Sequence, residues 1–140
     1  MNDNFFLDTN IFVYNFDNKN TFKQKRAQQL TRTALVEGGI ISWQVIQEFA
    51  NVALHKFEKP MNRDDLRDYI QTALLPLCAV WPGEAIYHEA LTVGLETGYR
   101  WYDSLILASA VKAQAHVLYS EDLQHDRVYR GTRVLNPFHE

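Results

Sequence analysis

Four acidic side chains stand at positions where an α/β protein could use them for chemistry. Asp8 directly follows the short apolar segment 5–7, and Asp122 follows the strand-like segment 116–119 by three residues. If both segments are strands of one parallel sheet, their carboxyl ends share an edge, where open α/β sheets bind ligands. Each residue also has an ordinary interpretation, because Asp is common in the turns that follow strands. The repeated placement favours a functional role for both.

Glu48 and Asp103 complete the set. Glu48 falls inside a predicted helix, at the border of its apolar face, where it is either a solvated boundary residue or a ligand. Asp103 opens the most apolar helical segment, and an acid there is also favoured by the helix dipole. Four clustered carboxylates would repel one another without cations, and oxygen ligands without paired His or Cys favour Mg²⁺ or Mn²⁺. Such a site supports hydrolysis of a phosphodiester or a phosphomonoester.

The elements that must position these acids alternate between short strands and longer helices. The apolar pattern predicts strands at 5–7, 40–41, 77–81 and 116–119, with a last short pair at 128–129 and 134–135. It predicts helices over 20–36, 42–57, 62–74, 84–98 and 105–115, and a polar turn at 8–10. This alternation is typical of an α/β fold, with a mostly parallel sheet covered by helices.

Length and composition limit the class of protein. The chain has 140 residues, of which 46% are hydrophobic and 22% charged, so we expect a single globular domain over 1–140. Its net charge of −3 argues against a protein that coats nucleic acid by charge alone. Cys78 is the only cysteine, which excludes an intrachain disulfide. Neither a signal peptide nor a membrane-spanning apolar run is evident, so we expect a cytoplasmic protein that does not bind membranes.

Four segments contain the four acids in order: LDTNIFVY (7–14), SWQVIQEF (42–49), YDSLILASA (102–110) and LYSEDLQHDR (118–127), the last followed by VLNPF (134–138). In this order they resemble the motifs of the PIN-domain family, and specifically of VapC-type toxin ribonucleases of type II toxin–antitoxin systems. The acids in these motifs are separated by 40, 55 and 19 residues. The resemblance covers nearly the whole chain and implies a three-layer α/β/α fold.

The resemblance also implies roles for individual residues. It assigns both catalysis and metal binding to four acids, Asp8, Glu48, Asp103 and Asp122. It assigns supporting hydrogen bonds to three polar neighbours, Thr9, Asn10 and Ser120. The fourth acidic position remains open to contributions from Glu121 or Asp126.

The activity implied by the family is a Mg²⁺- or Mn²⁺-dependent endoribonuclease acting on RNA such as tRNA or rRNA. The family's usual partners are an antitoxin, whose C-terminal segment blocks the active-site groove, and a second copy of the toxin. Bases that could contact RNA are Lys23 and Arg26, in a segment without acids between Asp17 and Glu37, and Arg100 beside Asp103. The basic segment can equally be a solvated helix face.

Two other functions fit parts of the sequence. A phosphatase of the haloacid-dehalogenase type also places an Asp after its first strand, but it needs a second Asp where this chain has Asn10. A catalytically silent PIN-like scaffold that binds RNA or protein is the second alternative. Retention of all four acids argues against it.

Overall fold

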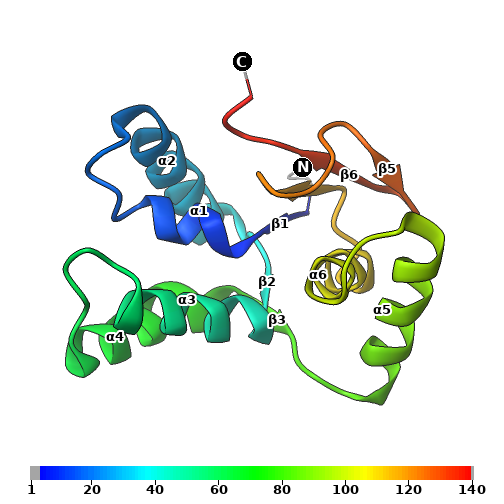
Figure 1. The fold of residues 1–140 in the computed structure, drawn as a ribbon, viewed down its shortest axis with the longest axis horizontal. Coiled ribbons are helices and arrows are strands. Elements are labelled where there is room, and N and C mark those ends of the chain that lie inside the picture. Colours follow the sequence, from blue (N-terminus) through cyan, green and yellow to red (C-terminus); the bar gives the residue numbers. More distant parts are fainter. Residues whose placement is uncertain (1–3, 140) are drawn as a thin grey trace.

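The strands of the protein form one nearly continuous parallel array. A computed structural model describes residues 4–139 (Figure 1). Strands β1 (Phe5–Leu7), β4 (Val117–Tyr119) and β6 (Thr132–Leu135) are parallel, and β5 (Val128–Tyr129) adds an antiparallel edge in the order β1-β4-β6-β5. Strands β2 (Ile41–Ser42) and β3 (Cys78–Val80) form a second parallel pair, which a parallel bridge between Phe6 and Ile40 joins to β1.

Helices cover both faces of these strands. Figure 1 shows the helices from the first half of the chain on one side and the two from the second half on the other. The first group is α1 (Thr9–Tyr14), α2 (Thr21–Glu37), α3 (Trp43–His55) and α4 (Arg63–Tyr69), and the second is α5 (Glu84–Thr97) and α6 (Trp101–Lys112). The predicted three-layer α/β/α class is therefore confirmed. Within residues 4–139, no helix is both long and apolar enough to cross a membrane.

Several boundaries differ from the sequence-based expectations, and the largest differences concern α1, α6 and the segment before β3. The segment 8–10 begins helix α1 instead of forming only a turn, because the Asp8 carboxylate accepts a hydrogen bond from the Thr9 backbone N–H and caps the helix. Helix α6 starts at Trp101, four residues earlier than predicted. The helix predicted over 62–74 ends as a π-helical turn over 70–74, followed by a 3₁₀ turn over 75–77 that contains Pro76 and shortens β3 to 78–80.

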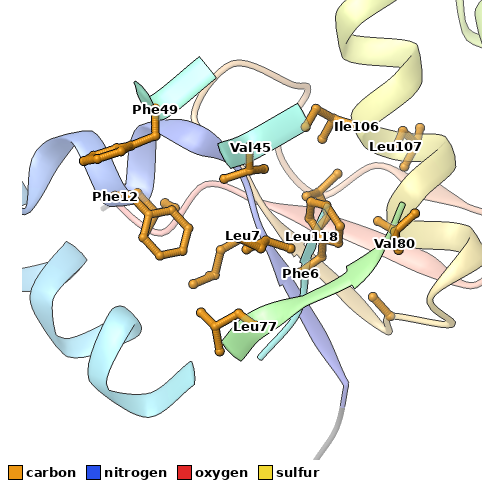
Figure 2. Packing of buried hydrophobic residues seen from close by; sticks show 14 of the residues in the cluster. Phe6, Leu7, Phe12, Val45, Phe49, Leu77, Val80, Ile106, Leu107 and Leu118 are labelled. Carbon is orange, nitrogen blue, oxygen red and sulfur yellow. The ribbon is translucent and has the colours of Figure 1, made fainter. Parts of the chain in front are cut away.

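The core holds the end of β1 in a fixed position. Phe6 and Leu7 are fully buried between the helical layers, close to Leu118 of β4 (Figure 2). Phe12 and Phe49 bury the inner faces of α1 and α3. Because apolar side chains anchor each element on both sides of the site, the polar residues that follow them have little freedom to move.

Candidate active site

A pocket of about 310 Å³ opens beside the carboxyl ends of β1 and β4. All four predicted carboxylates line it, contributed by four separate segments of the chain: Asp8, Glu48, Asp103 and Asp122. Thr9 and Asn10 also line it. The structure thus brings together residues that lie up to 114 positions apart in the sequence, as the shared strand edge predicts.

Asp8 is a buried carboxylate with both oxygens fixed. Its Oδ1 accepts from the Thr9 backbone N–H at 2.7 Å, and its Oδ2 accepts from the Ser120 hydroxyl at 2.7 Å. Only 6% of the residue is exposed, and this burial raises the pKa of Asp8 to about 7. The two hydrogen bonds oppose the increase, while the charges of Glu48 and Asp122 add to it. Asp8 is therefore a group that a bound cation would stabilise in its charged form.

Glu48 is oriented from two elements. The Thr9 hydroxyl donates to its Oε1 at 2.6 Å, and the Gln44 side-chain amide donates to its Oε2 at 3.3 Å. The same amide donates to the backbone carbonyl of Tyr102 at 3.1 Å, which ties α3 to the start of α6. Gln44 is not among the residues predicted for the site, although its position four residues before Glu48 on the same helix places the two side chains within reach of each other.

Asp122 is held in the segment that follows β4. The Asn10 side-chain amide donates to its Oδ2 at 2.7 Å, and its own backbone N–H donates to the Ser120 hydroxyl at 3.2 Å. Burial raises the pKa of Asp122, and the carboxylates of Asp103 and Glu121 raise it further. Ser120, itself fully buried, therefore supports both strand-end acids.

Asp103 lies in the first turn of α6, where burial raises the pKa of its carboxyl and the charge of Arg100 lowers it. The two alternatives for the fourth acid do not line the pocket. Asp126 forms an ion pair with Arg133 at 3.6 Å, and Glu121 contacts Lys23. Asp122 is therefore the acid of its segment that belongs to the pocket.

Two of the predicted RNA-binding bases are engaged within the protein. Lys23 Nζ lies 2.9 and 3.0 Å from the two carboxylate oxygens of Glu121 and 3.2 Å from the Tyr14 hydroxyl. Arg26 Nε donates to the carbonyl of Pro137 at 3.2 Å. These contacts tie α2 to the segment that carries Asp122 and to the C-terminal segment, so they favour a structural role for both bases.

Replacement of Lys23 by Met should lower the free energy of unfolding by about 1 kcal/mol, because a half-buried ion pair with three hydrogen-bonding groups is lost. Urea denaturation measures the change. Lys25→Met is the matched control, since Lys25 is exposed on the same helix. In a double-mutant cycle, Glu121→Gln should cost less in the Lys23→Met background than alone. Equal stability of the two lysine variants would contradict the structural role.

The donor set of the pocket suits a hydrated Mg²⁺ or Mn²⁺ ion. The described lining residues provide carboxylate, amide and hydroxyl oxygens and no His or Cys. Between residues 4 and 139, no three His, Cys, Asp or Glu side chains form a ready-made cage around one metal position. Mg²⁺ does not require such a cage, because it retains several waters and uses one or two carboxylates. The burial of Asp8 beside other acids supplies a site that gains from positive charge.

Comparisons with known proteins agree with this fold. The FitAcB structure from Neisseria gonorrhoeae has a TM-score of 0.67 at 18% identity, over 97% of this chain and 99% of that one. A toxin–antitoxin complex from Klebsiella pneumoniae gives 0.66 at 19% identity, over 94% and 96%. VapC20 of Mycobacterium tuberculosis, described as a sarcin–ricin loop-cleaving toxin, gives 0.62 at 16% identity, over 84% and 89%. No curated protein matches.

The decisive comparison is with protein families. The profile of the PIN domain matches residues 5–131, which include all four acids of the pocket and most of the chain. The resemblance seen in the sequence motifs is confirmed at the level of the fold and the family: the chain belongs to the PIN-domain family.

Proposed function

We propose that the protein is a Mg²⁺- or Mn²⁺-dependent endoribonuclease and acts as a VapC-type toxin. One observation carries the proposal, namely that four acids from separate elements line a single pocket and that three of them have a raised pKa because of burial. Buried, mutually repelling carboxylates reduce stability, so their presence at one strand edge is better explained by function than by folding.

The chain's own residues would prepare the site for hydrolysis. Of Asp8, Glu48, Asp103 and Asp122, one or two carboxylates would bind the ion directly, and the others would hold it through its retained waters. When bound, such an ion lowers the pKa of water and offsets charge on a phosphoryl oxygen. Hydrogen bonds from Thr9 and Ser120 to the carboxylates would keep those oxygens aimed at the pocket without rearrangement.

The remaining carboxylate oxygens are held in the same way. Asn10 fixes one oxygen of Asp122, and Gln44 fixes one oxygen of Glu48. An RNA phosphodiester would enter along the open side of the pocket, where Asp103 accepts no hydrogen bond from another described residue and is half-buried. Water would attack the phosphorus in line with the 3′ oxygen. The bond between phosphorus and that oxygen would break, so the products would carry 5′-phosphate and 3′-hydroxyl ends.

The partners follow from the fold's neighbours. A toxin–antitoxin complex and a toxin that cleaves the sarcin–ricin loop share this fold, which supports an antitoxin partner and an RNA substrate such as rRNA or tRNA. We also propose a homodimer and a cytoplasmic location, where these RNAs are found. A silent PIN-like scaffold is the alternative, and it requires that the four acids serve no chemistry.

Asp103→Ala should lower RNA cleavage about a hundredfold or more without lowering the melting temperature, because it removes one of several repelling charges. Incubation with total RNA followed by end mapping should show 5′-phosphate ends for the wild type. Products with 2′,3′-cyclic phosphate would exclude attack by water. A large fall in melting temperature would instead assign Asp103 to capping of α6.

A further inference from the structure

Lys56 occupies the junction of two adjoining cavities. It follows the last residue of α3 and lines the candidate active-site pocket. It also lines a second cavity of about 930 Å³, which lies between the α1–α2 and α3–α4 connections. Val52, one helical turn earlier, lines both spaces as well. The two cavities therefore adjoin at the side chains of Val52 and Lys56.

The charge of Lys56 is available to a ligand. It is the only basic residue among the described residues that line the active-site pocket, which four acids also line. Within the part of the chain that the structure describes, its ammonium forms no hydrogen bond or ion pair. Two other lysines line the second cavity. Lys19 pairs with Glu58 at 3.1 Å, whereas Lys59 forms no ion pair with another described residue and, unlike Lys56, does not line the active-site pocket.

The position of Lys56 along α3 indicates which part of a substrate it would contact. Glu48, Val52 and Lys56 are spaced by four residues and lie on one side of the helix. Eight residues correspond to a rise of about 12 Å along a helix axis. With this separation, Lys56 would reach a phosphate other than the one held at the acids.

We propose that Lys56 binds a backbone phosphate of the RNA next to the cleaved bond and directs the strand into the second cavity. This inference rests on the proposed nuclease function. The wall of the second cavity includes the rings of Phe16 and Phe57, and Phe16 is 39% exposed, which suits contact with unstacked bases. The lysine would also offset the repulsion that four carboxylates exert on an incoming phosphate.

A purely structural role for Lys56 makes a different prediction. A cation at a helix C-terminus interacts favourably with the helix dipole, and loss of that interaction lowers stability without changing RNA binding. Lys112 is the matched control, because it is an exposed lysine at the C-terminal end of α6 and lies outside both cavities.

Binding is measured separately from cleavage in the Asp8→Asn background. The probe is a fluorescein-labelled single-stranded RNA of mixed sequence, followed by anisotropy in Mg²⁺ at several KCl concentrations. Addition of Lys56→Gln should weaken binding about fivefold at low salt and reduce the slope of log K against log salt by about 0.7, the value for one phosphate contact on a single strand. Addition of Lys112→Gln should change neither quantity.

The outcomes separate this inference from the proposed function. An unchanged slope for Lys56→Gln, with RNA cleavage by the wild type intact, overturns the phosphate contact and leaves the nuclease standing. An unchanged slope is also expected if Lys56 binds an acidic protein partner, or if it only stabilises the C-terminal end of α3. If no variant binds RNA and the wild type cleaves none, both proposals are wrong.

Discussion

Asp8→Asn is expected to lower RNA cleavage about a thousandfold, which is the largest effect of any single substitution in this chain. The substitution keeps the size of the side chain and its cap on Thr9, because the amide oxygen of Asn can accept the same N–H. It removes the charge that both oxygens present to the pocket. Its amide nitrogen cannot accept the hydrogen bond that the Ser120 hydroxyl donates to Oδ2, so the loss would report the charge, metal binding and this one hydrogen bond, and not a change in size.

The same substitution should stabilise the metal-free protein at neutral pH. Burial raises the pKa of Asp8 to about 7 from an ordinary value of 3.8, so the folded state binds this proton more tightly than the unfolded state. The free energy of unfolding of the wild type therefore falls as the pH rises from about 4 to about 7, because Asp8 loses its proton in the buried site. The decrease is on the order of a few kcal/mol. The free energy of unfolding of Asp8→Asn does not decrease in this way, because Asn does not titrate.

Melting temperatures measured in EDTA test whether Asp8→Asn stabilises or destabilises the metal-free protein. Near pH 4 the melting temperature of Asp8→Asn should be only slightly higher than that of the wild type. The difference should grow as the pH rises to about 7. Asp68→Asn is the control, since Asp68 is exposed on α4 and should show no such trend and no loss of cleavage. A variant less stable than the wild type at neutral pH would show that the two hydrogen bonds of the carboxylate outweigh its burial.

The parts of the site that the sequence predicted depend on local patterns. Asp8 and Asp122 could be placed together because each follows an apolar strand, and parallel strands share the edge at which they end. Glu48 could be placed at a helix border from its position relative to the apolar stripe. These inferences need only periodicity and the order of elements.

The parts that were missed depend on tertiary contacts. The ion pair between Lys23 and Glu121 joins residues 98 positions apart, and nothing in the local sequence distinguishes Lys23 from the other bases of its helix. Lys56 is distinguished from other exposed lysines only by lining two cavities, which the sequence alone does not show. Helix α1 was missed because Asp, Thr and Asn favour turns and helix N-termini alike, so composition alone could not decide.

Removal of divalent cations should abolish cleavage by the wild-type protein, and Mg²⁺ or Mn²⁺ should restore it. Four acidic side chains line the pocket, so without a bound cation they repel the phosphate group of the RNA. The same cations should raise the melting temperature of the wild type, because a ligand held only by the folded state stabilises it by about 2.7 kcal/mol at 100 times its Kd.

Four reactions decide between this metal site and other sources of activity: wild type and Asp8→Asn, each with Mg²⁺ and with EDTA. Cleavage is expected in the first condition alone. Equal cleavage in all four would point to a contaminating nuclease or to a different site. Because Asp8→Asn removes the most buried charge of the cluster, Mn²⁺ should raise its melting temperature less than that of the wild type. An equal increase in both proteins would place the ion away from Asp8, and the four acids would then need another explanation.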